Sequence, residues 1–315
     1  MDIQQEIDKL NWAREPRGLY EPIGYALASG GKRLRPQLAV LAAQMFGGND
    51  NDVLPAALAL EVFHNFTLLH DDVMDRADVR RGRPTVHVRW NDNTAILSGD
   101  QMLIEAYKLL SNVRADKLPE VLRLFNKMAT EICEGQQYDV NFESKADTTI
   151  DDYLMMIRLK TSVLLATALR IGAYIAGADE QAQETLYQFG INMGLAFQIQ
   201  DDILDVYGDP ATFGKAIGGD ISCNKKTYVL LTALQMADAD TRQSLLYWLQ
   251  QTPADKQEKI TAVTALYNKI GVRAVCEDAV SRYSQAAIDN LSTLPQNQST
   301  EQLRQIVDKL NNRKV

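Results

Sequence analysis

Two acidic motifs in the sequence have the residue types and the spacing for divalent-metal chemistry. Both read Asp-Asp-x-x-Asp, and their members are Asp71, Asp72 and Asp75 in "DDVMD" and Asp201, Asp202 and Asp205 in "DDILD". On a helix, the first and last carboxylates of each motif share one face, and the middle one is turned by about 100° toward its edge. Clustered carboxylates without a histidine partner suit Mg²⁺, which keeps waters and completes its shell with phosphate oxygens. The motifs therefore predict a magnesium site that handles phosphates. The simpler alternative is a pair of solvated acidic helix ends.

Cationic residues gather at only a few places in the chain. They are Lys32, Arg33 and Arg35 in "SGGKRLRP", Arg80, Arg81 and Arg83 in "RRGRP", the single Lys160 inside an apolar helix, and Lys215, Lys225 and Lys226 in "FGKAIGGDISCNKK". Gly30 and Gly31 stand just before an expected helix start, where unpaired N–H groups and the helix dipole favour an anion. Arginine adds two parallel hydrogen bonds to a phosphate. Any one cluster alone is more often a solvated face. Together with the acidic motifs, they predict one diphosphate bridged by metal and a second one bound without metal.

The segments that precede the two motifs are apolar nearly all round. They read "LPAALALEVFHNFTLL" before Asp71 and "LYQFGINMGLAFQIQ" before Asp201. Such helices are buried in a core, and a diphosphate site at their ends also describes a pocket for a hydrocarbon tail with an anionic head.

Composition narrows the class of protein. The 315 residues include 41 acidic and 33 basic ones, and the formal charge of -8 argues against a nucleic-acid partner. The three cysteines lack metal-ligand spacing, which is typical of a reducing compartment. The N-terminus resembles no signal peptide, and we expect no stable membrane insertion. These features predict a cytoplasmic protein.

The fold class follows from hydrophobic spacing. Apolar residues recur three and four positions apart in most windows, whereas sustained alternation is hard to find, so we expect an all-α protein. The expected helices cover residues 36–46, 54–75, 94–110, 119–142, 150–177, 180–207 and 228–249, and a polar connector at 292–300 leads to a last short helix. Short loops imply antiparallel neighbours in one bundle. We expect a single domain over residues 1–315.

Five segments together resemble the trans-isoprenyl diphosphate synthases, or polyprenyl synthetases, of the farnesyl and geranylgeranyl type. They are "GGKRLRP", "HNFTLLHDDVMDRADVRRGRPTVH", "LKTS", "FQIQDDILDVYGD" and "GKAIGGDISCNKKTYVLLTAL". The resemblance implies the all-α isoprenoid synthase fold, in which the helices surround a deep central cavity and the two aspartate motifs face each other. It also implies a homodimer that adds isopentenyl diphosphate head to tail to an allylic diphosphate such as dimethylallyl, geranyl or farnesyl diphosphate.

The resemblance also assigns roles to individual residues. Three Mg²⁺ would be held by Asp71, Asp75 and Asp201, with Asp72, Asp202 and Asp205 nearby. The residues matching the allylic site are Arg80, Lys160, Gln198, Lys215 and Lys225, and Thr161 matches a position that steadies the carbocation. The residues matching the isopentenyl diphosphate site are Lys32, Arg35, His64 and Arg81.

Product length is expected to depend on the residues one to two turns before Asp71. A bulky side chain there would form the floor of the hydrocarbon pocket, and Phe66 and Thr67 stand five and four positions before Asp71. In the family, an aromatic residue at the fifth position goes with short products. Phe66 therefore predicts fifteen or twenty carbons, and "DDVMD" lacks the two-residue insertion of many bacterial farnesyl synthases, which favours twenty.

Three other functions fit the sequence less well. A class I terpene cyclase shares the fold and the first motif, but its second motif carries Asn, Ser and Glu, which "QDDILD" does not. A hydrolase of the His-Asp type would need separated histidine ligands, and only three histidines are present. A non-catalytic subunit of a heteromeric synthase would be expected to lose charged motif residues, and this chain keeps them.

Overall fold

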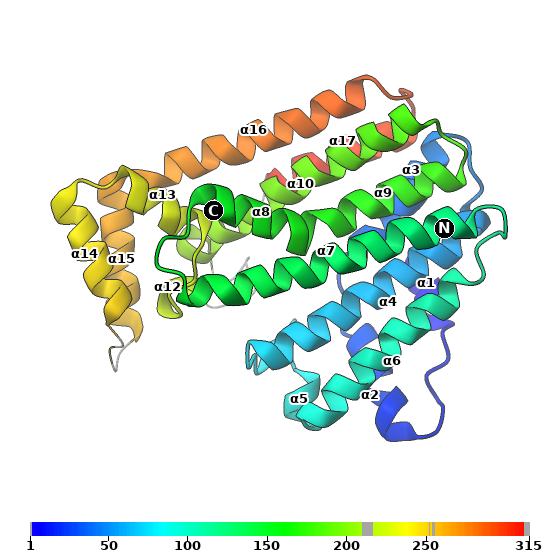
Figure 1. Ribbon diagram of the computed structural model, residues 1–315, viewed down its shortest axis with the longest axis horizontal. Helices are drawn as coiled ribbons and strands as arrows, with labels where there is room; N and C mark the ends of the chain where they lie inside the picture. The colour runs from blue at the N-terminus through cyan, green and yellow to red at the C-terminus, as the bar shows by residue number, and fades with distance from the viewer. Residues whose placement is uncertain (1, 210–216, 252, 254–255, 312–315) are drawn as a thin grey trace. The chain divides into compact units, whose positions relative to one another are not determined.

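The computed structural model describes residues 2–209, 217–251, 253 and 256–311, and almost all of its ordered elements are helices (Figure 1). In the part of the chain so described, the only strands are the two-residue β1 (Val79–Arg80) and β2 (Arg83–Pro84), which pair antiparallel. The prediction of an all-α protein is confirmed.

The chain divides into two compact units. Unit 1 comprises Met1–Lys127, Thr167–Tyr187 and Pro295–Thr300, and unit 2 comprises Met128–Ala166, Gln188–Leu294 and Glu301–Val315. The chain passes from one unit to the other within α7, α9, α10 and α17, and once in the connection between α16 and α17. That the two units form one domain remains a prediction.

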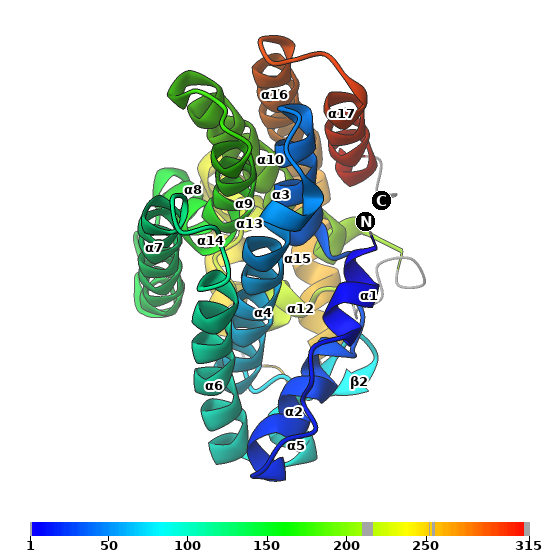
Figure 2. The ribbon, with the colours of Figure 1, turned by 90° about the vertical axis from the view of Figure 1, so that its right-hand side faces the viewer.

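Unit 1 is arranged around a long apolar helix. Its elements are α1 (Ile3–Asp8), α2 (Arg17–Leu27), α3 (Leu34–Met45), α4 (Asp50–Met74), the β1–β2 hairpin, α5 (Val86–Arg89), α6 (Asp92–Leu110), the first part of α7 (Leu118–Ser144), most of α9 (Val163–Ile175) and the starts of α10 (Glu180–Tyr207) and α17 (Gln298–Asn311). Helix α4 packs against α3 and α6, and α2 packs against α6 (Figures 1 and 2). Every residue from Ala56 to Asn65 on α4 is buried, so the apolar run that precedes the first aspartate motif is the core of this unit.

Helix α4 is also the one helix of the described chain that is long and apolar enough to cross a membrane. Of its most apolar window, 61% is buried inside the protein. A membrane span would expose that surface to lipid, so we read α4 as a core helix.

Unit 2 contains the second aspartate motif. Its elements are the second part of α7, α8 (Ile150–Ile157), the π-helical turn η1 (Arg158–Ser162), the start of α9 (Val163–Ile175), most of α10 (Glu180–Tyr207), α12 (Gly219–Ser222), α13 (Tyr228–Met236), α14 (Ala239–Gln250), α15 (Lys256–Ile270), α16 (Val272–Ser292) and most of α17 (Gln298–Asn311). Helix α13 packs against α16, and α15 packs against α12 and α14.

The structure corrects several expected helices. The single helix expected over residues 150–177 is interrupted by η1, and the one expected over 228–249 is two helices, because the Asp238 side chain accepts from the Thr241 N–H (2.7 Å) and caps a new helix start. Helices α1, α2, α15 and α16 were not predicted. On α15 and α16 the buried positions have helical spacing, but several of them hold polar or small residues, such as Lys259, Ser284 and Ala287, which weakens the apolar pattern. Helix α10 has the predicted bounds.

Candidate active site

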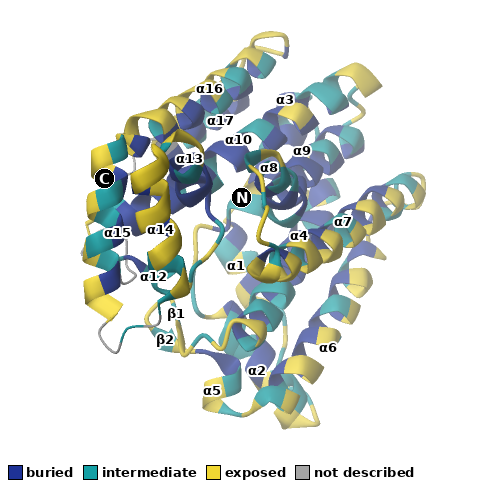
Figure 3. Cartoon of the chain, turned by 60° about the vertical axis from the view of Figure 1, so that its left-hand side comes forward, coloured by how far each residue is buried: buried dark blue, intermediate teal, exposed yellow. Residues whose placement is uncertain are grey.

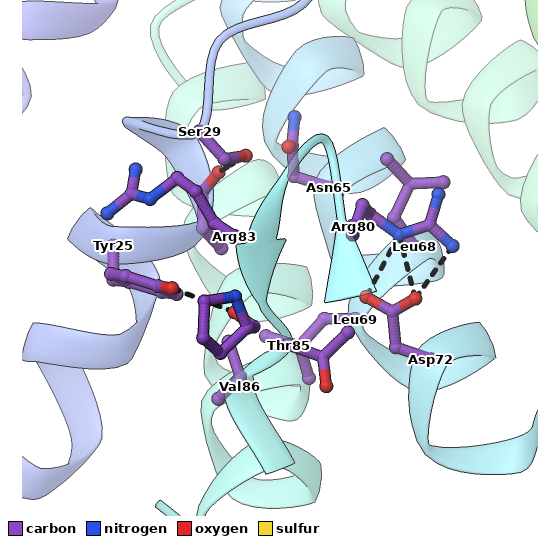
Figure 4. Close-up of a pocket in the computed structure, with 12 residues that line it drawn as sticks. Tyr25, Ser29, Asn65, Leu68, Leu69, Asp72, Arg80, Arg83, Thr85 and Val86 are labelled. Atoms are coloured by element: carbon purple, nitrogen blue, oxygen red, sulfur yellow. Dashed lines mark hydrogen bonds and ion pairs between the residues drawn. The ribbon is translucent and has the colours of Figure 1, made fainter. Parts of the chain in front are cut away.

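The first aspartate motif closes helix α4. Asp72 is 5% exposed and forms an ion pair with Arg80, whose Nε lies 2.7 and 2.9 Å from the two carboxylate oxygens (Figure 4). Asp71 is half-buried, and Asp75, the residue that ends the helix, is exposed. Burial raises the pKa of Asp72, and Arg80 opposes that shift. The middle carboxylate is therefore anchored inside unit 1, while its two neighbours are more accessible.

The β1–β2 hairpin explains how Arg80 reaches Asp72. Arg80 pairs with Arg83 across the two strands, and the turn between them consists of Arg81 and Gly82, with φ angles of 53° and 73°. Two residues with positive φ make the tight turn whose twist matches paired strands. Glycine adopts this conformation readily, but arginine does so at a cost, and such strain is concentrated at functional sites. The sequence "RRGR" is thus a hairpin that directs three arginines.

Three of the four residues matched to isopentenyl diphosphate come together in unit 1. Buried His64 has a pKa held well below its usual value, first by burial and then by the charges of Arg35 and Arg81. Burial likewise lowers the pKa of Arg35 to about 10, and the Arg35 Nε has no hydrogen-bond partner among the described residues. A neutral imidazole beside crowded guanidinium groups forms a site that favours an anion. The fourth residue, Lys32, is exposed and lies in the loop between α2 and α3, residues 28–33.

Two buried residues that the sequence analysis did not assign organise this cluster. Arg33 is 5% exposed and forms an ion pair of 2.7 Å with Glu61, which is 2% exposed. The Arg33 Nε donates to Gln4 (2.9 Å), and its Nη2 donates to the Leu27 carbonyl. Glu61 also raises the pKa of Arg35 and of Arg81 against the effect of burial. Arg33 therefore ties the loop between α2 and α3 to α1, α2 and α4. A signal for Glu61 was present in the sequence, because a lone acid in a buried apolar helix needs a partner.

The loop itself requires glycine. Arg81 donates to the carbonyl of Gly30, and a Cβ added at Gly31 would lie 2.7 Å from the Arg81 Nη1. Gly31 also has a φ of 129°. Any side chain there would displace the guanidinium, so "SGG" is fitted to Arg81 as well as open to an anion.

The second aspartate motif, on α10 in unit 2, resembles the first in its buried middle member, but it holds a second buried acid as well. Asp202 is 5% exposed and accepts hydrogen bonds from the Tyr153 hydroxyl and from the Tyr228 N–H (2.9 Å). Asp205 is buried and accepts from the Asp220 N–H (3.0 Å), whereas Asp201 is half-buried. Burial raises the pKa of Asp202 to about 7, and the charge of Asp220 adds to that shift. In both motifs the middle aspartate is the anchored one.

The donor set fits Mg²⁺. Within the described ranges, no three His, Cys, Asp or Glu side chains converge into a ready-made metal cage. Zinc sites need such a cage, whereas Mg²⁺ is held by one or two carboxylates and completes its shell with water and substrate phosphates. Asp71 and Asp75, one helical turn apart at the end of α4, offer this kind of partial shell.

Lys160 and Thr161 lie in the π-helical turn η1 of unit 2. The Lys160 Nζ lies 2.6 Å from a carboxylate oxygen of Asp139, and the Thr161 hydroxyl lies 3.4 Å from the Gln198 side-chain oxygen. The residues matched to the allylic site and to the cation are thereby brought together. Asp139 was not predicted, although it stands in α7 as the counter-ion of the one lysine in an apolar helix.

Two glycines allow neighbouring helices to pack closely against the π-helical turn η1. A Cβ at Gly135 of α7 would lie 2.4 Å from the Lys160 backbone nitrogen, and one at Gly194 of α10 would lie 2.5 Å from the Ser162 Oγ. The backbones of α7 and α10 thus approach η1 more closely than larger residues would allow. Single π-helical turns of this kind are frequent at functional sites.

The remaining predicted allylic residues are placed as follows. Lys225 is exposed and follows Asn224, which has a φ of 58°, and its charge lowers the pKa of Asp202 against the effect of burial. Arg80 belongs to unit 1, where it pairs with Asp72. Lys215 lies outside the described residues.

Comparison with known proteins decides the family. The sequence matches "Polyprenyl synthetase" over residues 16–266. The chain belongs to the polyprenyl synthetase family. It is 42% identical over 235 residues to a geranylgeranyl diphosphate synthase of Methanosarcina mazei, covering 74% of this chain and 72% of that one. The predicted isoprenoid synthase fold and trans-prenyltransferase class are confirmed.

Solved structures agree with this assignment. The crystal structure of a geranylgeranyl pyrophosphate synthase superposes with a TM-score of 0.94 at 46% identity, covering 99% of this chain and 97% of that chain. One from Corynebacterium glutamicum, complexed with isoprenyl diphosphate and magnesium, gives a TM-score of 0.88 at 28% identity, covering 99% of this chain and 98% of that chain. The family is magnesium-dependent and acts on prenyl diphosphates.

The synthase carries a row of aromatic rings behind its first motif. Phe66 contacts His70 (4.8 Å between ring centroids) and Phe63 (5.4 Å), and Phe63 contacts Phe125 (5.1 Å). The Thr67 hydroxyl donates to the His64 carbonyl (2.8 Å), so it is turned toward its own helix. Phe66 is half-buried, whereas Phe63 and Phe125 are buried. Phe66 is thus the least buried of the three phenylalanines in this row.

Asp202 gives the metal-free synthase a pH-dependent stability of defined sign. An unfolded aspartate has a pKa near 4, whereas that of Asp202 is raised to about 7. Between these values the folded protein holds a proton that the unfolded chain releases, so its stability must fall as pH rises through this range and level off above it.

We therefore expect the wild-type protein in a chelator to lose thermal stability relative to Asp202→Asn as pH is raised from 5 to 8. The midpoint of thermal unfolding, measured at each pH, checks this. Asp151→Asn, an exposed change on α8, serves as the control. A pH-independent difference between wild type and Asp202→Asn would contradict the shift.

Proposed function

We propose that this chain condenses isopentenyl diphosphate with an allylic diphosphate to make the twenty-carbon geranylgeranyl diphosphate. The observation that carries the proposal is the contrast in unit 1 between two kinds of anion site. Exposed Asp75 and half-buried Asp71 end α4, while a metal-free cluster of Arg35, Arg81 and neutral His64 lies beside the same helix. The allylic substrate loses its diphosphate in the reaction, whereas isopentenyl diphosphate keeps its own. The two diphosphate groups therefore need different sites. Relatives named geranylgeranyl diphosphate synthase support the product length.

We assign the metal to the accessible carboxylates. Asp71, Asp75 and Asp201 would hold three Mg²⁺, while Asp72 and Asp202, which are already hydrogen-bonded inside the protein, would fix the two motifs. Asp205 would hold the α12 segment through the Asp220 N–H. When bound, Mg²⁺ stabilises the negative charge that develops on the departing diphosphate.

The protein side chains would bind and orient the two substrates. Lys160, Gln198, Lys225, Arg80 and Lys215 would contact the allylic substrate, and Lys32, Arg35, His64 and Arg81 would bind isopentenyl diphosphate. The Thr161 hydroxyl would face the carbocation. Lysine and arginine donors suit diphosphate groups, which stay negatively charged. A neutral His64 can donate a hydrogen bond to isopentenyl diphosphate without adding another positive charge beside Arg35 and Arg81.

The reaction needs no nucleophile from the protein. The allylic C–O bond breaks and its electron pair leaves with diphosphate. The alkene of isopentenyl diphosphate then supplies the electrons of the new C–C bond, and the product loses a proton to the released pyrophosphate. The free cysteines agree with this, because burial raises the pKa of Cys133 and of Cys276, to about 12 for the latter. Their free state also supports the expected cytoplasmic location, which stays a prediction.

The two proposed subsites should separate in kinetics. We expect Arg81→Gln to raise the KM for isopentenyl diphosphate about tenfold or more and Lys160→Gln to do the same for the allylic substrate, because each change removes a charged donor. The other KM should change less than twofold in each case. Steady-state kinetics with each substrate varied in turn would measure this.

Arg83→Gln is the matched control for Arg81→Gln, since Arg83 lies on the same hairpin and stacks on Tyr25 (4.1 Å from its guanidinium carbon to the ring centroid). If Arg81→Gln raised both constants equally, the two-subsite assignment would be wrong.

Product length provides a second test. We expect Phe66→Ala to extend the main product by at least one five-carbon unit, because it removes the least buried phenylalanine of the aromatic row, while buried Phe63 and Phe125 still limit growth behind it. The dephosphorylated products can be sized by mass spectrometry. Phe46→Ala, a half-buried change at the end of α3, is the control. An unaltered product distribution would place the floor elsewhere.

We also propose that the protein is a homodimer formed through α6. This helix has exposed stretches (Figure 3). Among its exposed residues are apolar ones that share one side of the helix: Ile96, Leu97, Ile104 and Tyr107, with exposed fractions of 43%, 60%, 50% and 39%. An exposed row of apolar residues at helical spacing favours packing against another apolar helix face, here α6 of a second copy of the chain. Light scattering should give twice the chain mass for the wild type and a lower mass for Leu97→Glu with Ile104→Glu. A monomeric wild type would refute the proposal.

A further inference from the structure

The segment from Gly218 to Lys225 is tied to α10 on one side. The Gly218 N–H donates to the Asp205 carbonyl (2.6 Å), and the Asp220 N–H donates to the Asp205 carboxylate (3.0 Å). These bonds fasten the start of the segment, which includes α12, to the last aspartate of the second motif. They do not by themselves fix its end, where Lys225 stands.

The end of the segment turns through Asn224. Asn224 has a φ of 58°, a left-handed conformation that asparagine tolerates better than most residues do. Its N–H donates to the Ile221 carbonyl (3.2 Å), and the next N–H, that of Lys225, donates to the Asp220 carbonyl (2.9 Å). The direction of the chain at Lys225 therefore depends on how firmly Asn224 is held.

Helix α15 holds the segment at both ends. Gly218 packs so closely on Ile260 that an added Cβ would lie 2.6 Å from its Cγ2. The preceding residue, Lys259, is 2% exposed, and its Nζ donates to the Asn224 side-chain oxygen (2.6 Å) and to the Gln251 carbonyl (3.0 Å). Lys259 lines a small pocket together with Asp220, Asn224 and Lys225.

Burying the charged amino group of Lys259 costs free energy. Burial penalises its charge and lowers the pKa of Lys259, so the side chain is stable only while its donors are hydrogen-bonded. No described carboxylate lies within ion-pair distance of its Nζ. The two oxygen acceptors instead make Lys259 a clamp between the Gln251 backbone and the Asn224 side chain.

We propose that Lys259 is a positioning residue for the allylic diphosphate site, which acts through Asn224 to hold Lys225 in place. The proposal rests on the assignment of Lys225 under the proposed function. Lys259 lies in α15, beyond the motifs that carry the family resemblance, and it would touch neither substrate nor metal. Its effect should therefore appear only in the use of the allylic substrate.

The first experiment compares Lys259→Met with wild type. Methionine keeps an apolar stem of similar length but cannot donate, so we expect the KM for the allylic diphosphate to rise about tenfold while the KM for isopentenyl diphosphate changes less than twofold. Lys269→Met is the matched control, because the Lys269 Nζ also donates from α15, to the Thr241 hydroxyl (2.9 Å), away from this segment. Lys269→Met should leave both constants within twofold.

A double-mutant cycle then asks whether Lys259 acts through Lys225. If it does, Lys259→Met combined with Lys225→Gln should be no worse than Lys225→Gln alone. Should Lys259→Met fail to fold, Asn224→Gly breaks the same hydrogen bond while keeping the left-handed turn, and it should raise the same KM.

Three results have distinct meanings. A Lys259→Met protein that melts earlier but keeps both KM values would overturn the positioning role, and so would full additivity with Lys225→Gln. If Lys225→Gln itself left the allylic KM unchanged, the assignment of Lys225 would be wrong and the present inference would fall with it.

Discussion

A carboxylate that is removed from water needs a hydrogen-bond or ion-pair partner, and both aspartate motifs are arranged by this requirement. Asp72 is satisfied by Arg80, and Asp202 by Tyr153 and the Tyr228 N–H. Each middle aspartate thereby fixes the end of its helix, α4 or α10. Burial of Asp72 in the first motif, and of Asp202 and Asp205 in the second, separates structural carboxylates from the accessible ones that suit a metal ion.

The same requirement organises the cationic residues. Arg33 forms an ion pair with Glu61, and this pair supports the loop that carries Lys32 and leads into α3, where Arg35 lies. Lys160 is balanced by Asp139, and Lys259 by two neutral oxygens. These contacts between protein groups hold the cationic side chains in place. Binding groups that are held by the protein itself reduce the binding energy needed to order a site.

Much of this could be predicted from the sequence, because the strongest signals were local. The long apolar helices α4 and α10, the two acidic motifs and the residues Arg35, His64 and Arg81 follow from spacing and from family resemblance. The partners did not follow. Tyr153, Asp139 and Lys259 reach their sites through tertiary packing, and single residues in unremarkable surroundings give no local pattern. Glu61 is visible as a lone acid in an apolar helix, but its partner Arg33 could not be identified from the sequence.

Irregular backbone was equally hidden. The π-helical turn at Lys160 is packed closely against Gly135 and Gly194, which lie 25 or more positions away in other helices. The hairpin turn at Arg81 and Gly82 lies in a segment whose charges favoured an interpretation as a binding loop. At both places the local sequence favours regular structure or a solvated loop, and close contact elsewhere overrides it. These are also the places where the proposed substrate-binding residues stand.

The central claim is that this chain extends allylic diphosphates with isopentenyl diphosphate, using magnesium held by its aspartates. The most direct test is to incubate the purified protein with isopentenyl diphosphate and dimethylallyl, geranyl or farnesyl diphosphate, with Mg²⁺ or with a chelator, and to size the dephosphorylated products by mass. The account predicts a linear ladder that ends mainly at twenty carbons with Mg²⁺ and no product with the chelator. A cyclic hydrocarbon, or no elongation of any primer, would contradict it.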